Sequence, residues 1–328
     1  MHHENLSHNN PRVSIITVNY RQADVTCDLL DTLVKNSYAA HFDLIVVDNG
    51  STFDPTEQFR QHAPSVKVII SEANLGFAGG NNLGIAAAVG DYLFFVNNDT
   101  LFTDGLVETL LERLFSDEKI GAVSPKIRYA AAPQYIQYAG FTAMHPLMGR
   151  NRAVGKNHPD DGTFDRAYPT AYAHGAAIMV RRAVIDQIGV MPTPYFLYYE
   201  ELDWCAQMQR ANFSIWYEGN ATIFHRESVS VGKASPLKKH YQIRNRLLFM
   251  RRNASKMGLL FFIPYFFGVT IIPELVYLFL PQKVYLLIAS LKSFREGLTV
   301  AANVSLKKSS SLNTTKNLPP TPIVKYSA

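Results

Sequence analysis

The stretch Asp91-Tyr92-Leu93-Phe94-Phe95-Val96-Asn97-Asn98-Asp99 decides the fold and indicates where the site lies. Its apolar part has the length and composition of a strand buried on both faces, as in a parallel sheet. The run stops at two amides and a carboxylate, and ligands of open α/β sheets lie beyond the carboxyl ends of strands. Asp99 is therefore expected to hold a ligand or its metal ion, because Mg²⁺ takes one or two carboxylates together with substrate phosphates. The simpler alternative is a turn, since Asn-Asn-Asp-Thr is good turn chemistry.

The sequence before this stretch alternates between strand and helix patterns. The predicted elements are, in order, strand 13–18, helix 24–35, strand 42–47, helix 54–62 and strand 66–70. This alternation predicts an α/β fold with a doubly wound, mostly parallel sheet. Two of the strands end in polar residues, Asn19 and Asp48, which are expected at the same sheet edge as Asp99. That edge is where such folds bind nucleotides.

A glycine-rich segment, Asn74-Leu75-Gly76-Phe77-Ala78-Gly79-Gly80-Asn81-Asn82, follows the third strand. Its glycines would let the backbone approach a ligand, and Asn81 is expected to cap the helix that follows. A helix N-terminus after such a loop favours anions, for example a diphosphate. The glycine spacing fits neither the dinucleotide-binding fingerprint nor the P-loop, which disfavours a dehydrogenase or an NTPase. A flexible loop is the alternative.

The second half of the predicted domain is less regular. Its predicted elements are helix 104–115, strands 120–124 and 174–180, helices 181–188 and 200–210, and short strands 215–217 and 221–224. Residues 129–172 between them lack periodicity. A long irregular stretch inside a compact domain is usually functional or disordered, so we expect this one to face the substrate.

Three carboxylates open the helix that begins at Glu200: Glu200, Glu201 and Asp203. Acidic residues in a first turn suit the helix dipole, which is the simpler explanation. Crowded, partly buried carboxylates also have raised proton affinity, which suits a general base. Further along, an apolar run leads into His225, a candidate metal ligand, although a single histidine is more often structural.

These segments together resemble the family-2 glycosyltransferases, inverting enzymes with the GT-A fold. The resemblance covers about residues 12–250, and the subgroup it indicates is the bacterial rhamnosyltransferase-like enzymes of cell-surface polysaccharide assembly. It rests on six segments in this order: Val13–Tyr20, Val46–Ser51, Asn74–Asn82, Asn97–Asp99, Gly175–Arg182 and Tyr199–Cys205. It implies transfer of a sugar from a nucleotide-diphosphate donor to a hydroxyl of a glycan or lipid-linked glycan.

The resemblance also implies how the donor is held. Asp48 resembles the carboxylate that binds the nucleobase. Asn98 and Asp99 occupy the family's Asp-x-Asp position, whose last aspartate holds Mg²⁺ or Mn²⁺ on the donor diphosphate. The first position here is Asn97, so the site carries fewer charges than the strict motif. The implied donor-binding residues are Asn19, Asp48, Asn74, Gly79, Asn81 and Asn98.

The acidic triplet resembles the family's catalytic region. Glu200-Glu201 is similar to the Glu-Asp pair whose second member is the catalytic base, so Glu201 is expected to take the acceptor's proton. A one-step displacement would then invert the anomeric centre. Glu200 and Asp203 are expected to support this base. His225 resembles a histidine that contacts the metal or the diphosphate, so the implied metal residues are Asp99 and His225.

Charge is distributed unevenly along the 328 residues. Residues 1–232 hold 17 Lys and Arg against 25 Asp and Glu, whereas residues 233–328 hold 15 against 2. A basic, apolar tail indicates an anionic surface as its partner. Nucleic acid is the competing partner, but the tail's long apolar runs favour lipid. The two cysteines, Cys27 and Cys205, form no disulfide framework or metal spacing, which favours a reducing compartment.

The tail contains a basic helix over 241–256 and an apolar run over 259–280 that is long enough to span a bilayer. Pro264, Pro273 and Glu274 interrupt this run and favour a broken or interfacial segment instead. We expect the tail to bind the cytoplasmic face of the bacterial inner membrane, where a lipid-linked acceptor would be presented. The alternative is an additional helical layer that packs on the enzyme body.

Composition divides the chain into four parts. They are a disordered leader without a signal peptide (1–11), a GT-A domain (12–232), basic and apolar helices (233–300) and a disordered tail (301–328). Two other functions compete with sugar transfer. A nucleotidyltransferase would need a basic phosphate-binding loop near the N-terminus, where residues 13–21 offer only Arg21. A non-catalytic, membrane-recruited protein would have little use for the acidic triplet.

Overall fold

The computed structural model describes residues 12–36, 38, 42–226, 236–310 and 325–326. The predicted leader, residues 1–11, and most of the predicted disordered tail lie outside these residues. The description therefore concerns the GT-A region and the helices that follow it.

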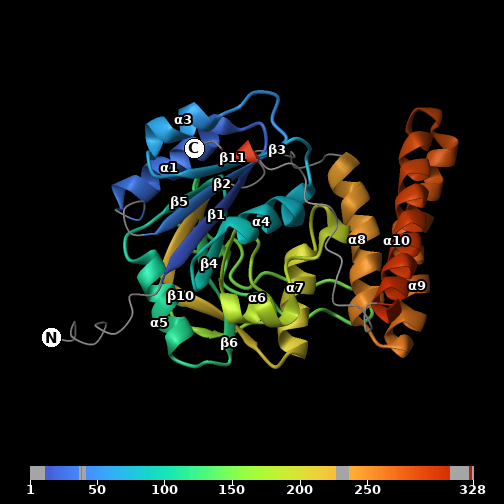
Figure 1. The fold of residues 1–328 in the computed structure, drawn as a ribbon. Coiled ribbons are helices and arrows are strands. Elements are labelled where there is room, and N and C mark those ends of the chain that lie inside the picture. Colours follow the sequence, from blue (N-terminus) through green and yellow to red (C-terminus); the bar gives the residue numbers. More distant parts are fainter. Residues whose placement is uncertain (1–11, 37, 39–41, 227–235, 311–324, 327–328) are drawn as a thin grey trace.

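A central sheet positions the polar residues that the sequence singled out (Figure 1). Its parallel part consists of β1 (Val13–Asn19), β2 (Asp43–Asn49), β3 (Lys67–Ser71) and β4 (Tyr92–Asn97), in the spatial order β3-β2-β1-β4. Asn19 lies opposite Asp48 and Val18 lies opposite Asn97. The parallel arrangement is confirmed, and it brings the ends of three strands to one edge.

The other part of the sheet is mixed. β9 (Ala177–Arg181) is antiparallel to β4 and β6 (Ile120–Tyr129), and β10 (Ser214–His225) runs parallel to β6. The predicted short strands at 215–217 and 221–224 are one strand, β10, with an irregularity between Glu218 and Thr222. Strands that the sequence did not predict are β5 (Thr100–Phe102), β7 (Ile136–Tyr138), β8 (Tyr168–Pro169) and β11 (Lys325–Tyr326).

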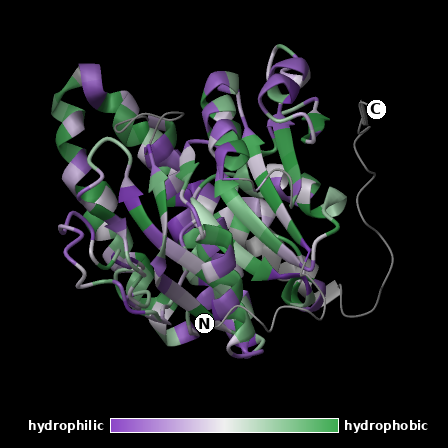
Figure 2. Ribbon diagram, turned by 90° about the vertical axis from the view of Figure 1, so that its left-hand side faces the viewer, coloured by the Kyte–Doolittle hydropathy of each residue, from purple (hydrophilic) through white to green (hydrophobic). Residues whose placement is uncertain are grey.

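Helices cover both faces of the sheet, and each face has its own hydrophobic core. One core contains buried side chains of α1 (Ala23–Lys35), α3 (Thr56–His62) and α5 (Leu106–Phe115). The other contains buried side chains of α4 (Gly76–Ala87), α6 (Arg182–Ile188) and α7 (Glu200–Arg210). Side chains alternate along a strand, so Ile15 joins the first core and its neighbour Ile16 joins the second. Figure 2 shows hydrophobic residues along the central strands between these helices.

The C-terminal part packs on the enzyme body. It comprises α8 (Pro236–Asn253), α9 (Lys256–Ile271), the 3-10 helices η2 (Ile272–Phe279) and η3 (Pro281–Lys283), and α10 (Val284–Ser310). Leu247, Phe249 and Phe262 from this part belong to the same core as α4, α6 and α7. The helical layer considered as the alternative to membrane binding is therefore present, and α10 extends beyond residue 300, where composition places a boundary.

The apolar run behaves as a broken helix. α9 passes through Pro264 and changes to 3-10 geometry at Ile272, next to Pro273. Within the described residues, one helical segment, Lys256–Phe279, is long and apolar enough by length and composition to cross a membrane. Only 22% of the most apolar part of this segment is buried inside the protein, so most of its hydrophobic surface faces outward.

Candidate active site

A chain of hydrogen bonds joins the ends of β1, β2 and β4. Asn19 Nδ2 donates to Asp48 Oδ1 at 2.6 Å, and Asn19 Oδ1 accepts from Thr26 Oγ1 at 2.9 Å. Thr26 Oγ1 in turn accepts from Asn98 Nδ2 at 3.1 Å, and Ser51 Oγ donates to Asp48 Oδ1 at 2.6 Å. The structure thus brings together three of the predicted donor-binding residues, Asn19, Asp48 and Asn98. Thr26 and Ser51 were not singled out from the sequence.

The glycine-rich segment differs from the prediction. Helix α4 already begins at Gly76, so Gly79 lies inside the helix, where an added Cβ would come 2.5 Å from Leu75 Cβ. Asn81 does not cap the helix: its Nδ2 donates to the Phe77 carbonyl one turn earlier, at 3.0 Å, and the residue is buried. The expected N-cap role of Asn81 is therefore wrong. The glycines serve close packing of α4 on the sheet, since Gly80 lies against Val18.

Asn74 is held by a residue that the sequence did not single out. Asn49, at the end of β2, donates to Asn74 Oδ1 at 3.1 Å and to the Gly76 carbonyl at 3.0 Å, and it accepts from the Leu75 amide at 2.9 Å. The Asn74 oxygen also accepts from the Gly76 amide. Asn49 therefore ties the start of α4 to the strand that carries Asp48, and places Asn74 beside the polar chain.

Asp99 and His225 form a pair, as the resemblance predicts. His225 Nε2 lies 3.1 Å from Asp99 Oδ1, and both side chains are less than 10% exposed. Gln137 Oε1 lies 2.9 Å from His225 Nδ1 and accepts a hydrogen bond from it, so the other ring nitrogen, Nε2, faces Asp99. A ring nitrogen and a carboxylate oxygen that face each other can share a cation between them. This donor set therefore fits a divalent metal ion, with Gln137 orienting the ring.

The pair does not form a complete metal cage. In the described part of the chain, no group of three or more His, Cys, Asp and Glu side chains could hold a metal ion. Asn97 contributes an amide 3.4 Å from His225 Nε2 where the strict motif has a carboxylate. A metal held by Asp99 and His225 would need further oxygen ligands from water and a phosphorylated ligand, which is how Mg²⁺ is usually bound.

The two glutamates at the start of α7 have different environments. Glu200 is 2% exposed, and within the described residues its Oε2 has no hydrogen-bond partner. Burial, together with the charge of Glu201, raises the pKa of Glu200 well above its usual range, which favours its protonated form. Burial raises the pKa of Glu201 to about 7, which suits a group that takes up a proton at neutral pH.

Asp203 does not join these glutamates. Its Oδ2 accepts from Arg252 Nε and its Oδ1 accepts from Asn253 Nδ2, both at 2.7 Å, and the side chain is fully buried. Both oxygens are thus used to dock α7 onto α8. The expectation that Asp203 belongs to a crowded acidic site is wrong, because α7 turns this side chain toward α8.

The loop that leads into Glu200 is conformationally strained. Phe196, Tyr198 and Tyr199 all have φ near +70°, a backbone conformation that residues other than glycine rarely adopt. Asn245 on α8 holds this loop: its Nδ2 lies 2.9, 2.7 and 2.9 Å from the carbonyls of Tyr195, Leu197 and Tyr198. A single sequence carries no signal for this role, which depends on α8 packing beside the loop.

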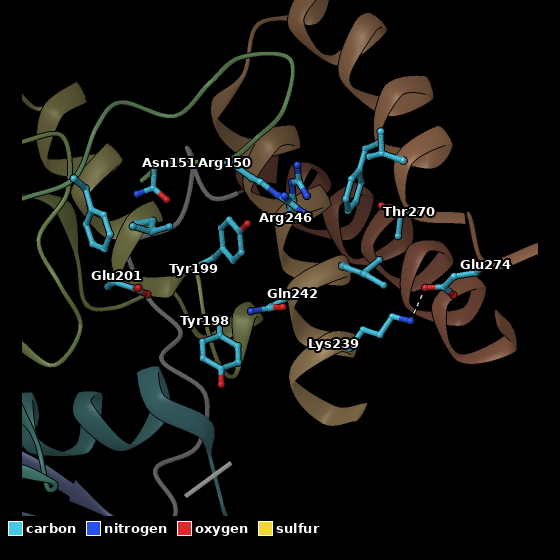
Figure 3. A pocket seen from close by; sticks show the side chains of 15 residues that line it. Arg150, Asn151, Tyr198, Tyr199, Glu201, Lys239, Gln242, Arg246, Thr270 and Glu274 are labelled. Atoms are coloured by element: carbon cyan, nitrogen blue, oxygen red, sulfur yellow. Dashed lines mark hydrogen bonds and ion pairs between the residues drawn. The ribbon is translucent and has the colours of Figure 1, made fainter. Parts of the chain in front are cut away.

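Glu201 faces a pocket of about 530 Å³ between the GT-A body and the C-terminal helices (Figure 3). α7, α8 and α9 contribute to its walls, and the irregular stretch 129–172 contributes Phe141, Arg150 and Asn151. Two adjacent residues lie between this pocket and the pair formed by Asp99 and His225. Gly175 lies against Glu201, and the ring of the adjacent His174 lies 6.1 Å from that of His225.

The model for glycosyl transferase family 2 matches residues 14–189, which is more than half of the chain. The chain belongs to this family. It is therefore a glycosyltransferase, and family membership supports transfer of a sugar from a nucleotide-sugar donor. The two competing functions, a nucleotidyltransferase and a non-catalytic protein, lose their support.

Characterised relatives of this glycosyltransferase assemble glycans. It is 25% identical over 221 residues to the N-acetylglucosaminyl-diphospho-decaprenol L-rhamnosyltransferase of Mycobacterium tuberculosis, covering 61% of this chain and 72% of that one. It is 26% identical over 242 residues to the low-salt glycan biosynthesis hexosyltransferase Agl10 of Haloferax volcanii, covering 72% and 74%. The resemblance to rhamnosyltransferase-like enzymes is confirmed.

Solved structures establish the fold of the glycosyltransferase. A mannosyltransferase from Pyrobaculum calidifontis, in complex with GDP-Man and Mn²⁺, superposes with a TM-score of 0.54 at 15% identity, over 93% of this chain and 82% of that one. GalNAc-T7 with UDP, GalNAc and Mn²⁺ gives a TM-score of 0.57 at 14% identity, over 74% and 48%. The predicted GT-A architecture is confirmed.

Proposed function

We propose that this glycosyltransferase transfers a deoxyhexose, with rhamnose as the first candidate, from a dTDP-sugar to a hydroxyl of a lipid-linked saccharide. The observation that carries the proposal is Glu201, whose carboxylate faces the pocket and has a proton affinity suited to neutral pH. The relative from M. tuberculosis, whose name specifies an L-rhamnosyltransferase acting on a diphospho-decaprenol-linked sugar, supports the choice of both substrates.

The donor is assigned to the edge of the sheet formed by β1, β2 and β4. Asp48 and Asn19 would hold the nucleobase, with Asn98 and Asn74 beside them. Gly79 and Asn81 are left out of the proposed donor site, since Gly79 packs against Leu75 inside α4 and the Asn81 amide is bonded to the Phe77 carbonyl of the same helix. Asp99 and His225 would hold Mg²⁺ or Mn²⁺, which when bound would balance the charge that develops on the leaving diphosphate.

Glu201 supplies the base. An acceptor hydroxyl has a pKa far above neutral, so it needs a base within hydrogen-bond reach as it attacks the anomeric carbon. The Glu201 carboxylate accepts this proton while the bond from the anomeric carbon to the diphosphate breaks on the opposite side. This single displacement inverts the anomeric centre. Burial raises the pKa of Glu200 above its usual range, which favours a protonated Glu200 beside an ionised Glu201.

The enzyme is assigned to the cytoplasmic face of the bacterial inner membrane. Hydrophobic side chains on α9 and η2 point outward, among them Leu260, Phe261, Ile272 and Phe279, which are 58–85% exposed. The C-terminal part of the chain carries an excess of basic residues, which attract anionic lipid. Both features favour a segment that lies in the membrane surface, with its pocket open to lipid-linked acceptors.

The pH dependence follows from the pKa of Glu201. Below about pH 7 the carboxyl is protonated and cannot accept a proton, so kcat/KM should rise about tenfold per pH unit and level off above pH 7. Tyr198 and Tyr199 stay protonated across this range because burial raises the pKa of each above the ordinary tyrosine value. Initial rates between pH 5 and 9 test this profile. A flat profile over pH 5–8 would show that a group of ordinary carboxyl pKa, or none, is the base.

The Asp99→Asn variant should require at least about tenfold more Mn²⁺ for half-maximal turnover, because a neutral amide binds a divalent cation more weakly than a carboxylate. The measurement is the initial rate against Mn²⁺ concentration at saturating donor. Asp160→Asn is the control. Asp160 is paired with Lys126 and not with His225, so this variant should leave the Mn²⁺ requirement unchanged. If the wild type and Asp99→Asn need the same Mn²⁺ concentration for half-maximal turnover, Asp99 does not hold the metal ion.

The function itself is tested by incubating the full chain, with Mn²⁺, with dTDP-rhamnose, UDP-glucose or GDP-mannose and a synthetic N-acetylglucosaminyl-diphospho-lipid. The expected product, found by mass spectrometry, carries one added deoxyhexose from the dTDP donor, with an inverted anomeric linkage by NMR. Transfer from UDP-glucose instead would keep the transferase and refute rhamnose. Turnover only with acceptors that lack a lipid would refute the lipid-linked substrate.

A further inference from the structure

The pocket beside Glu201 has a basic wall without a matching acid. Arg246 on α8 is 5% exposed and lies 4.4 Å from the centre of the Phe266 ring, while its Nη2 donates to the Met148 carbonyl. Among the residues that the structure describes, its Nε has no hydrogen-bond partner, and neither does the buried Asn151 Nδ2 on the same pocket. Unpartnered buried donors are costly, so this wall favours a ligand that accepts hydrogen bonds.

A second guanidinium stands near the first. Arg150 lines the same pocket, and its positive charge, after the larger effect of burial, helps to lower the pKa of Arg246. Figure 3 shows Arg150 and Arg246 close together, with Asn151 on the side of the pocket nearer Glu201. Within the described residues, no carboxylate forms an ion pair with either arginine. Two nearby guanidinium groups without a counter-ion repel each other, and an anion between them would remove that repulsion.

The other charged groups of the pocket are already engaged. Lys239 and Glu274 pair at 2.5 Å, and they lie on the side of α8 and η2 (Figure 3). Glu201 is separated from the arginines by Tyr199, whose pKa responds to Arg246 and Arg150 as well as to Glu201. The pocket is thus polarised, with the base at one end and two cations at the other.

The hydrophobic face of the C-terminal helices begins at the cationic end. Val269 lines the pocket and is 47% exposed, and Ile272 and Val276 continue the exposed apolar surface along η2. A ligand that follows this surface meets, in order, hydrocarbon, cations and then the base. That order matches an amphiphile in which a phosphate joins a lipid to a sugar.

We propose that Arg246, Arg150 and Asn151 form a subsite for the phosphate or diphosphate that links the acceptor sugar to its lipid. The arginines bind phosphate oxygens through charge-assisted hydrogen bonds, and the subsite sets the distance between the membrane and Glu201. This inference rests on the proposed function, because it places the acceptor of that reaction. It adds that the phosphate is recognised by the protein itself rather than merely tolerated.

The decisive test compares two acceptors that carry the same sugar. One is the sugar-diphospho-lipid and the other is a neutral alkyl glycoside of equal chain length. Arg150→Ala and Arg246→Met should each raise KM for the diphospho-lipid at least about tenfold and leave KM for the alkyl glycoside unchanged. Arg246→Met keeps the contact with Phe266, and the exposed Arg150 can be replaced without disturbing the core. Equal losses with both acceptors, or no loss with either, would overturn the subsite.

A binding measurement separates this inference from the proposed reaction. Vesicles of phosphatidylcholine containing a sugar-free polyprenyl phosphate should bind the wild type at least about tenfold more tightly than Arg150→Ala. Lys119→Ala, which removes an exposed charge between α5 and β6 on the GT-A body, should bind as the wild type does. Competition by millimolar inorganic phosphate would assign the affinity to the phosphate group alone. If inorganic phosphate does not compete, the affinity is assigned to the lipid phosphate. If Arg150→Ala binds equally well, the subsite is refuted even where transfer is observed; if only transfer fails, the proposed reaction is refuted.

Discussion

Replacing Glu201 with glutamine is expected to lower kcat by about 10³-fold, because the amide cannot accept the proton of the attacking hydroxyl and a general base contributes 10²–10⁴-fold. Donor affinity should change little, since no residue of the donor edge contacts Glu201. The measurements are single-turnover transfer and calorimetric donor binding on the same preparation. The pH dependence below pH 7 should also disappear, which a purely structural defect would not cause.

The neighbouring glutamate offers a matched control. Burial favours the protonated form of Glu200, and glutamine closely resembles a neutral carboxylic acid in shape, so Glu200→Gln should keep turnover within about tenfold of the wild type. The two variants change the same functional group at adjacent positions. A larger loss in Glu200→Gln than in Glu201→Gln would exchange the two assignments, and full turnover in Glu201→Gln would exclude Glu201 as the base.

Asn245→Leu is expected to reduce kcat by about 10²-fold, because a displacement of about 1 Å in a catalytic group can have an effect of that size. Leucine has the same number and branching of side-chain heavy atoms as asparagine but cannot donate to the three carbonyls of the strained loop before Glu200. The loop should relax and carry Glu201 away from its position. Steady-state kinetics should show the loss in kcat, with the KM for the donor unchanged.

Asn253→Leu separates positioning from stability. Asn253 lies on the same helix and also loses a hydrogen bond between helices, to Asp203, but it does not contact the loop. Both variants should have a lower Tm, whereas only Asn245→Leu should lose most of its turnover. Similar kcat values in the two variants would mean that Asn245 contributes to stability alone.

The parallel half of the sheet was predictable from local pattern. Apolar runs of strand length alternate with helical spacing from Val13 to Val96, and each run ends in a polar residue, so topology alone places Asn19, Asp48 and Asp99 at one edge. The pair of Asp99 and His225 was predictable only through the family resemblance. The two residues are 126 positions apart, and the register of β10 against β5 brings them together.

The errors arose where tertiary packing overrides local preference. Asn81 has the chemistry of a helix cap, but α4 begins five residues earlier because Asn49 anchors that turn from another strand. Asp203 sits three residues after Glu200, yet α8 supplies Arg252 and Asn253 as its partners. The basic stretch predicted over 241–256 also includes residues with roles that the sequence did not predict, since Asn245 holds the loop before Glu200 and Arg246 lines the pocket.

The most direct test of the central claim, that the edge formed by β1, β2 and β4 binds a nucleotide donor through a metal ion, is calorimetry. The full chain is titrated with dTDP, UDP and GDP, each with and without Mn²⁺. We expect dTDP to bind most tightly, with an affinity that depends on Mn²⁺ and is lost when Asp48 is replaced by alanine. Absence of binding for all three nucleotides in the presence of Mn²⁺ would contradict the claim.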